Sequence, residues 1–453
     1  MALDPKVFKA YDVRGLYPSE LDEAGAYAVG RAFVEEFEPG KIAVGRDMRV
    51  SSPSMAEAVV QGAADGGAEV VDIGMIGTEM LYFGVGELEA DGGVMVTASH
   101  NPKEYTGMKI VRRGALPVGG DSGLLAIRDR AVSIQDTPGS DPAVSETVDI
   151  YPAFVERVLS FIDIGEVKPL RVVIDAGNGM AGAMMPPILE RLPVDAVRCF
   201  FDPDGSFPNH EPNPLLPENR EFVMSKVREE SADLGIAFDG DADRCFFVDD
   251  TGEFVPGDFV TALLAESMLE KERGAKIIYD VRASWAVPDV VEKHGGSPLV
   301  NRVGHAFIKE RMRKEGALFG GEVSGHYYFR DFNQADSGTI PALLMLELVS
   351  KRGERLSEIL RPFTEHYFIT GELNTPVPDV ALKLQELKEH FADEGEISHL
   401  DGISVTAEDW HMNVRPSNTE PLLRLNLEAL DRELMERKRD EALAVIRGEG
   451  PIN

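Results

Sequence analysis

Short apolar runs alternate along the chain with longer segments of helical period. The first succession begins with KIAVG (41–45) and a helical stretch near 53–66, and it continues through AEVVDIG (68–74) to GGVMVTASHNP (92–102). This alternation of strand and helix patterns is typical of βαβ units and mostly parallel sheets. We therefore expect an α/β fold.

The same succession of strand, helix, strand, helix and strand recurs twice. Its strands are LRVVIDAG (170–177), VDAVRCFF (194–201) and DLGIAFDGDADR (233–244), then AKIIYDV (275–281), SPLVNRVG (297–304) and GALFGGEVSGH (316–326). The period is too long for a solenoid, so it indicates domain triplication. Each succession ends in a polar, glycine-containing loop after a strand, where open sheets bind ligands.

Polar, proline-containing stretches at 133–149 and 366–379 separate these units. After the second stretch we expect a helix (380–392), strands near 402–406 and 422–428, and a final helix (431–447). The sequence thus predicts three related mixed α/β domains plus a smaller C-terminal α+β domain. The expected boundaries are 1–140, 150–250, 251–365 and 366–453.

Composition excludes several classes of function. The 453 residues carry a formal net charge of -32, which excludes a basic surface that coats nucleic acid. Two cysteines, Cys199 and Cys245, are too few for a disulfide framework. The N-terminus has no apolar leader, and no run of 18 apolar residues is present. We expect a soluble cytoplasmic protein with neither nucleic-acid nor membrane partners, although such acidity at first disfavours anionic substrates.

The segment FDGDADR (238–244) carries the strongest metal signal. Asp239, Asp241 and Asp243 alternate with small residues, so three carboxylates can converge on a hard divalent cation. An EF-hand would need glycine and glutamate where Arg244 and Asp250 stand. A solvated acidic turn is the alternative, but the strand patterns on both sides favour a metal site.

The segment VMVTASHNP (94–102) places Ser99 just beyond a strand, followed by His100. Its hydroxyl could be a nucleophile or carry a phosphoryl group, but the neighbours differ from the G-x-S-x-G elbow of hydrolases. A helix cap explains the residue types equally well. Spacing alone leaves these two interpretations open.

The segment RPSNTEP (415–421) brings a cation, two hydroxyls and an amide together within five residues: Arg415, Ser417, Asn418 and Thr419. Such a loop can hold a phosphate. In isolation, however, an ordinary polar turn is the better interpretation.

In GEVSGH (321–326), Glu322, Ser324 and His326 alternate between glycines. Donors and acceptors on such a loop suit sugar hydroxyls, and a hairpin without function is the alternative. A third glycine-containing segment, Gly177, Gly179 and Gly182, follows a strand as a dinucleotide fingerprint does. A tight strand-to-helix turn needs these glycines anyway, so the NAD(P)-dependent oxidoreductase that they suggest ranks low.

Five motifs in one order resemble those of the α-D-phosphohexomutase family: AYDVRG (10–15), TASHNP (97–102), DGDADR (239–244), GEVSGH (321–326) and RPSNTEP (415–421). They extend over nearly the whole chain and are most similar to bacterial-type phosphomannomutase/phosphoglucomutase members. The resemblance implies four domains around a central cleft. It departs from the family at Arg282, where many members have lysine, and at Ala242, where glycine is frequent. Arg282 can bind charge but cannot act as a base.

The resemblance also implies roles for individual residues. Ser99 would be the phosphoserine and would bind one Mg²⁺ together with Asp239, Asp241 and Asp243. The implied catalytic set is Ser99, Lys109, His305, Arg14 and His100. Lys109 and His305 are both candidates for the general acid and base. The implied substrate-binding set is Arg244, Arg282, Gly304, Glu322, Ser324, His326, Arg415, Ser417, Asn418 and Thr419.

The implied activity is the reversible conversion of mannose 6-phosphate and mannose 1-phosphate through a 1,6-bisphosphate, with some phosphoglucomutase activity. The hexose 1,6-bisphosphate would also serve as activator, and the enzyme would be a monomer or weak homodimer. Phosphoglucosamine mutase and phosphoglucomutase are alternatives of the same class. The acidity fits this activity once the cations in the motifs are considered, because a local basic focus can concentrate sugar phosphates.

Overall fold

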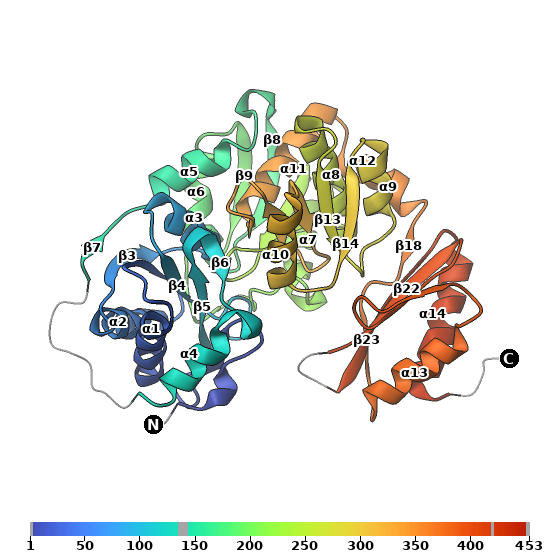
Figure 1. The fold of residues 1–453 in the computed structure, drawn as a ribbon. Helices are drawn as coiled ribbons and strands as arrows, with labels where there is room; N and C mark the ends of the chain where they lie inside the picture. Colours follow the sequence, from blue (N-terminus) through green and yellow to red (C-terminus); the bar gives the residue numbers. More distant parts are fainter. Residues whose placement is uncertain (1–2, 135–143, 418–420, 450–453) are drawn as a thin grey trace. The chain divides into compact units, whose positions relative to one another are not determined.

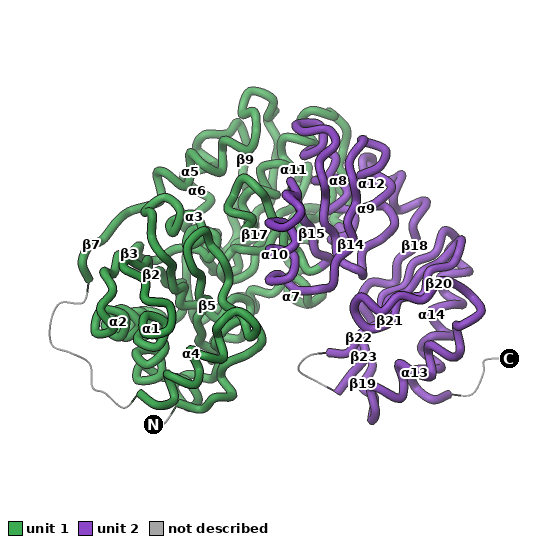
Figure 2. Tube along the Cα trace, in the orientation of Figure 1, with its two compact units in different colours: residues 1–254, 324–356 green, residues 255–323, 357–453 purple. Residues whose placement is uncertain are grey.

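The computed structural model describes residues 3–134, 144–417 and 421–449. The chain forms two compact units (Figure 2). Unit 1 comprises residues 1–254 and 324–356, and unit 2 comprises residues 255–323 and 357–453. The chain therefore passes from unit 2 to unit 1 between Val323 and Ser324, inside one of the predicted site motifs.

Unit 1 begins with a sheet in the order β1-β5-β4-β2-β3-β7, in which β6 pairs with β5 (Figure 1). Its strands are β1 (Val13–Leu16), β2 (Lys41–Arg46), β3 (Glu69–Met75), β4 (Gly92–Val96), β5 (Tyr105–Arg112), β6 (Leu116–Pro117) and β7 (Glu146–Thr147). Strand β2 is parallel to β3 and β4, whereas β5 is antiparallel to β4.

Helices cover both faces of this first sheet. They are α1 (Glu23–Phe37), α2 (Ser52–Asp65), α3 (Thr78–Glu87) and α4 (Leu124–Ala131). Ile42, Val44, Val94 and Val96 alternate along β2 and β4 and face one apolar core with α1, α2 and α4. This period of two is what the sequence pattern predicts for strands whose two faces pack against different helices.

The second sheet of unit 1 contains β11-β10-β8-β9 in that order. The elements of this part are α5 (Tyr151–Leu159), β8 (Leu170–Asp175), α6 (Ala181–Leu189), β9 (Val194–Cys199), α7 (Pro217–Glu230), β10 (Leu234–Phe238) and β11 (Cys245–Val248). Three later elements also belong to unit 1: β16 (Tyr327–Phe329), β17 (Ala335–Asp336) and α11 (Thr339–Arg352). Strand β12 (Phe254–Val255) lies where the chain enters unit 2.

Unit 2 contains a parallel set in the order β14-β13-β15. Its elements are α8 (Gly257–Lys271), β13 (Lys276–Asp280), α9 (Ala286–Lys293), β14 (Ser297–Asn301), α10 (His305–Glu315), β15 (Phe319–Gly321) and α12 (Leu356–Thr364). The parallel arrangement again matches the strand and helix alternation of the sequence.

An antiparallel sheet completes unit 2, in the order β18-β23-β22-β21-β20, with β19 paired to β23. Its elements are β18 (Phe368–Ile369), β19 (Leu373–Pro376), α13 (Val380–His390), β20 (Glu396–Ser398), β21 (Ile403–Thr406), β22 (Trp410–Pro416), β23 (Leu422–Ala429) and α14 (Arg432–Arg447). Helices α13 and α14 share an apolar core with this sheet.

The sheet orders confirm the triplication and the four-part fold. In β4-β2-β3, β10-β8-β9 and β15-β13-β14, the third strand of each succession lies beside the first, and the second lies on the other side. Ser99 follows β4, Asp239 follows β10 and Glu322 follows β15. Each predicted loop therefore leaves the carboxyl end of an equivalent strand.

Some local expectations were wrong. The predicted linker at 366–379 contains strands β18 and β19, and β22 was not expected, so Arg415 lies in a strand rather than in a turn. Strands β18 and β19 are too short to show a period of their own, and pairing with β23 stabilises them. Strand β22 does alternate apolar Trp410, Met412 and Val414 with polar residues, and its apolar residues pack in the core of this sheet. Among the described residues, no helix has the length and apolar character that crossing a membrane requires.

Candidate active site

Ser99 lies in a tight loop between β4 and β5. Its backbone is in the left-handed region, with φ of 50°, and its N–H donates to Thr97 Oγ1 at 2.9 Å. The residue is almost completely buried. The hydroxyl donates to Asp239 Oδ2 at 3.0 Å and lies 3.2 Å from His100 Nδ1. The loop thus directs the hydroxyl of Ser99 at the predicted metal loop.

The Asp239–Asp243 loop connects the buried strands β10 and β11. Asp239, Asp241 and Asp243 are buried, and one carboxylate oxygen of each lies within 4.8 Å of the others. Ala242 adopts a left-handed φ of 58°, which makes the turn tight enough to bring the alternate aspartates together. Strands rather than helices flank this loop, so the EF-hand alternative does not apply.

Lys109, on β5, provides the positive charge nearest to this cluster. Its ammonium group donates to Asp241 Oδ2 at 2.8 Å and to Asp243 Oδ2 at 2.5 Å. Burial opposes the charged form of Lys109, but the two carboxylates raise its pKa well above the usual value. In this metal-free arrangement the two carboxylates therefore favour the charged form of Lys109.

The pKa shifts of the three aspartates reflect the crowding of buried carboxylates, which a bound cation would relieve. Burial and the carboxylates of Asp243 and Asp241 raise the pKa of Asp239 well above its usual range. Burial, followed by Asp241, raises the pKa of Asp243 to about 6. Burial also disfavours ionised Asp241, but Lys109 keeps the pKa of Asp241 below its usual value. Oδ1 of Asp241 and Oδ1 of Asp243 have no hydrogen-bond partner among the described residues. Such crowded oxygen ligands fit Mg²⁺.

Thr78, at the start of α3, supports the metal loop from the first domain. Its N–H donates to Asp241 O at 3.0 Å, and its hydroxyl donates to Asp241 Oδ2 at 2.5 Å. Sequence reasoning did not identify Thr78, because a single threonine near the start of a helix is typical of an ordinary cap.

Arg14 and His100 flank the serine loop. Arg14, on β1, pairs with Asp12 and donates to Asn101 Oδ1. Burial, together with the charges of Arg244 and Arg14, lowers the pKa of His100 well below its usual value. His100 is thus neutral at neutral pH.

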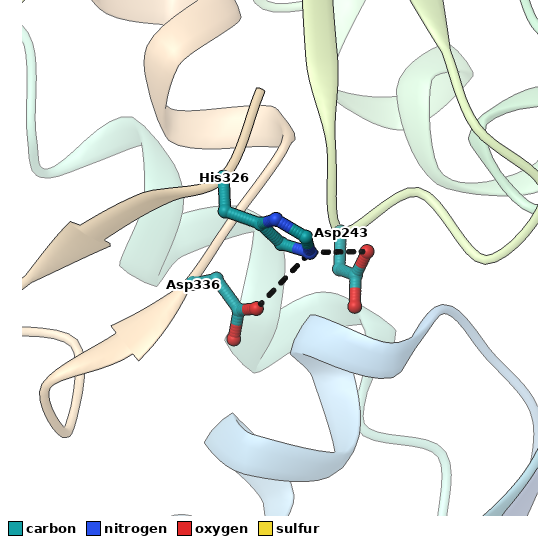
Figure 3. Close-up of side chains that lie close together, drawn as sticks. All are labelled: Asp243, His326 and Asp336. Atoms are coloured by element: carbon teal, nitrogen blue, oxygen red, sulfur yellow. Dashed lines mark ion pairs between the residues drawn. The ribbon is translucent and has the colours of Figure 1, made fainter. Parts of the chain in front are cut away.

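Arg244 and His326 meet at the metal loop. Arg244 Nε lies 3.2 Å from His326 Nε2, and the backbone N–H of Arg244 donates to Asp239 Oδ1 at 3.2 Å. Figure 3 shows His326 Nε2 between the carboxylates of Asp243 and Asp336, at 3.8 and 3.9 Å. Asp336 was not predicted, since its position in β17 carries no motif.

The remaining members of the GEVSGH motif belong to different units. Ser324, in unit 1, has its hydroxyl 3.3 Å from His326 Nδ1. Glu322, in unit 2, accepts from the N–H of Gly304 at 2.9 Å. Gly304 has a φ of 127° and immediately precedes His305, the first residue of α10. Within unit 2, therefore, Gly304, His305 and Glu322 come together from two predicted segments.

Arg282 is enclosed by carboxylates in unit 2. Its guanidinium makes a bidentate pair with Asp280, at 2.9 and 2.8 Å, and lies 3.9 Å from Glu322. Burial opposes its charge, but Asp280 and the other carboxylates raise the pKa of Arg282. The bidentate geometry explains how the arginine is held at this position.

Glu372 connects Arg415 of the predicted phosphate loop with two arginines outside it. It accepts from Arg415 Nη2 and Arg424 Nη1, each at 2.8 Å, and lies 3.5 Å from Arg282 Nη1. Ser417 Oγ lies 3.3 Å from Arg424 Nη2. Sequence reasoning did not identify Glu372 and Arg424, because each lies outside RPSNTEP. The predicted residues Asn418 and Thr419 lie outside the described part of the chain.

The glycines of the dinucleotide-like fingerprint serve close packing. A Cβ on Gly179 would approach Gly240 O to 2.7 Å, and one on Gly182 would approach Phe201 O to 2.0 Å. Gly177 has a φ of 54°. These contacts account for the three glycines without a bound dinucleotide.

A buried acid lies close to the metal loop. Glu79, on α3, is completely buried and accepts from the hydroxyls of Ser337 and Thr339. Burial raises the pKa of Glu79 to about 8, and the hydroxyl donors only partly oppose this. A Cβ on Gly338 would lie 2.5 Å from Ala242 O, so this segment packs directly on the metal loop.

We expect Glu79 to make stability depend on pH. Because its pKa is raised in the folded state, the native protein retains a proton that the unfolded chain has lost between about pH 5 and 8. The free energy of unfolding therefore falls as pH rises through this window, by at most about 1.4 kcal/mol per pH unit. Urea unfolding of wild type and Glu79→Gln across this range measures the effect. The Gln variant should lose this part of the slope, and identical slopes would contradict the assignment.

Comparisons with known proteins agree with this arrangement. Family models described as phosphoglucomutase/phosphomannomutase match in order: alpha/beta/alpha domain I at 5–135, domain II at 152–252, domain III at 256–367 and the C-terminal domain at 372–445. The chain therefore belongs to the phosphoglucomutase/phosphomannomutase family, one of the phosphohexomutases.

Similar proteins share nearly the whole length of the chain. "Phosphohexose mutases" of Xanthomonas campestris are 45% identical over 443 residues, covering 97% of this chain and 99% of that protein. A phosphomannomutase of Escherichia coli K12 is 44% identical over 449 residues, covering 97% and 98%. The crystal structure of a family protein from Burkholderia thailandensis has a TM-score of 0.88 and 32% identity, covering 99% of each chain.

Proposed function

We propose that the chain is a phosphomannomutase that interconverts mannose 6-phosphate and mannose 1-phosphate through a 1,6-bisphosphate. The observation that carries the proposal is the buried hydroxyl of Ser99, 3.0 Å from Asp239 in a cluster of three aspartates. The phosphomannomutase of Escherichia coli, 44% identical over almost the whole chain, supports mannose phosphates as substrates. The reaction makes the protein an isomerase that works by phosphoryl transfer.

The residues of unit 1 would carry the transfer. Phosphorylated Ser99 donates its phosphoryl group to the free hydroxyl of the sugar phosphate, which yields the 1,6-bisphosphate. The other phosphoryl group of this intermediate then returns to Ser99. Lys109, Arg14 and Arg244 provide positive charge beside the transferring group, which is the main requirement of such a reaction. Lys109 and His305 both remain candidates for the acid and base.

We assign Mg²⁺ to Asp239, Asp241, Asp243 and an oxygen of phosphorylated Ser99. When bound, the ion would neutralise negative charge on the transferring phosphoryl group. We propose that a hexose 1,6-bisphosphate activates the enzyme by phosphorylating Ser99 when the phosphate has been lost.

The sugar and its second phosphate would be bound mainly by unit 2. The contacts of Glu322 with Gly304, and the cluster of Arg415, Arg424 and Arg282 around Glu372, support this assignment. Ser324 and His326, which belong to unit 1, stay predicted substrate-binding residues, as do Asn418 and Thr419. The domain boundaries 1–140, 150–250, 251–365 and 366–453, a cytoplasmic location and a monomer or weak homodimer also stay predictions.

Phosphoglucomutase activity is a second candidate. The similarity to proteins described as phosphohexose mutases favours a site that accepts more than one sugar. Coupled assays with mannose, glucose and glucosamine phosphates test this preference directly. We expect the highest kcat/KM with mannose 1-phosphate, measurable turnover of glucose 1-phosphate and little of glucosamine 1-phosphate. Equal or greater efficiency with the glucosamine phosphate would contradict the proposal.

Removal of divalent metal should abolish this activity. We expect chelator-treated enzyme to be inactive, and Mg²⁺ to restore turnover, since the aspartate cluster needs a cation to bind a phosphoryl group. Calorimetry with NAD(P) on the same preparation should show no binding. Full turnover without divalent metal would mean that the aspartates are only structural.

A further inference from the structure

The serine loop rests on one buried arginine. Arg49 lies between β2 and α2 and is 1% exposed. Its guanidinium donates to three main-chain carbonyls of the loop and to that of Tyr105, the first residue of β5: Ser99 O at 2.7 Å, Asn101 O at 2.6 Å, Pro102 O at 2.8 Å and Tyr105 O at 3.2 Å. The planar guanidinium can donate hydrogen bonds to several carbonyls at once, which a single ammonium group cannot do in this geometry.

Residues outside the serine loop hold Arg49 in place. Asp47 Oδ2 lies 3.3 Å from Arg49 Nε, while Asp47 Oδ1 accepts from the N–H of Arg49 at 2.9 Å and from Ser52 Oγ at 2.5 Å. The Phe207 ring, on a loop of the second domain, stacks 5.1 Å from the guanidinium carbon. A Cβ on Gly205 would lie 2.4 Å from the Cα of Arg49. The arginine is therefore held on several sides within unit 1.

Ser99 needs such support because its backbone conformation is unfavourable. A left-handed φ in a residue other than glycine persists only where the surroundings hold it. Thr97 holds the N–H of Ser99, and Arg49 holds the carbonyl of Ser99. With both peptide groups fixed, the hydroxyl stays 3.0 Å from Asp239.

We propose that Arg49 is a positioning residue for phosphoryl transfer, which keeps Ser99 aligned with the metal loop in both half-reactions. The inference rests on the proposed function of Ser99. Arg49 does not touch the reacting atoms, so it acts only through the loop. Its loss should slow the chemical step and leave substrate affinity nearly unchanged, because the proposed substrate-binding groups lie elsewhere.

The test is Arg49→Lys, which retains the positive charge but loses the planar guanidinium and its several N–H donors. We expect kcat to fall about 100-fold, in line with the effect of a small misplacement of a reacting group. KM should stay within about threefold of wild type, because the contacts that bind the substrate are not affected. Single-turnover phosphorylation of dephosphorylated enzyme by glucose 1,6-bisphosphate should slow by the same factor as kcat. Arg112→Lys is the matched control, because Arg112 also stacks on a phenylalanine in the first domain but lies outside the serine loop.

Chemical rescue distinguishes positioning from a general structural role. In Arg49→Ala, millimolar guanidinium should raise kcat at least about tenfold, by occupying the space of the missing group, whereas methylammonium should not. All rates refer to the folded fraction, measured by circular dichroism. Asp47→Asn, which keeps the guanidinium but loosens its orientation, should show the same fall in kcat at constant KM to a smaller extent.

Several results would overturn the proposal. These are an unchanged kcat in Arg49→Lys, a rise in KM that accounts for the whole loss of efficiency, the absence of guanidinium rescue, or failure of all three variants to fold. Failure of the proposed function gives a different result, because wild-type enzyme would then not accept phosphate on Ser99 at all.

Discussion

Ser99→Ala should lower kcat by about 10⁴-fold or more while the protein still folds and binds sugar phosphates. The hydroxyl of Ser99 reaches the metal loop, at 3.0 Å from Asp239. Without it, no phosphoryl group can be stored between the two half-reactions. Isothermal calorimetry with mannose 1-phosphate and a coupled assay of turnover measure binding and catalysis separately.

The control for Ser99→Ala is Ser133→Ala, an exposed serine of the same domain. This variant should keep wild-type activity and stability. Turnover of Ser99→Ala close to that of the control would exclude Ser99 as the phosphoryl carrier. A melting temperature of Ser99→Ala far below that of the control would instead identify a folding defect.

Asp239→Asn should lower activity without lowering the stability of the metal-free protein. Burial and two neighbouring carboxylates raise the pKa of Asp239 well above its usual range, so a neutral side chain already fits the metal-free site. Asparagine removes the remaining repulsion and should leave the metal-free stability unchanged or raise it, by about 1 kcal/mol. Activity should fall by about 10³-fold, because a ligand beside Ser99 is lost.

Thermal unfolding with and without Mg²⁺ measures this separation. Wild type should melt at a higher temperature in the presence of Mg²⁺, because the ion binds only the native state. Asp239→Asn should lose most of this increase, whereas Asp202→Asn, an exposed aspartate of the same domain, should retain it. An unchanged Mg²⁺ effect in Asp239→Asn would show that the ion binds elsewhere.

The repeated elements were predictable because their signals are local. Strands such as β8 and β13 have apolar runs bounded by glycine or polar residues, and the loops that follow them carry the motifs. The aspartate triplet was likewise visible, since its three carboxylates alternate with small residues between positions 239 and 243. The sequence therefore predicted the order of the domains and the loops that hold the candidate site.

The residues that support the candidate site were not predictable, because each contacts a segment that is distant along the chain. Arg49 contacts carbonyls 50 or more positions away, and Thr78 reaches Asp241. Asp336 approaches His326 only after β16 and β17 have paired. None of these residues belongs to a local pattern that separates it from an ordinary cap or ion pair.

The net charge of -32 does not oppose an anionic substrate. In unit 1, Lys109 pairs with Asp241 and Asp243, and Arg244 lies beside Asp239. In unit 2, Arg415 and Arg424 share the single carboxylate of Glu372. Each unit thus brings cations to the proposed binding residues, where the local field is set by nearby charges.

The most direct test of the phosphoserine mechanism is the site of covalent phosphate. The purified protein is incubated with glucose 1,6-bisphosphate and Mg²⁺, and its intact mass and peptides are then measured. A single addition of ~80 Da that maps to Ser99, and disappears when excess mannose 6-phosphate is added, is the predicted result. Absence of the added mass, or its location on another residue, would contradict the account.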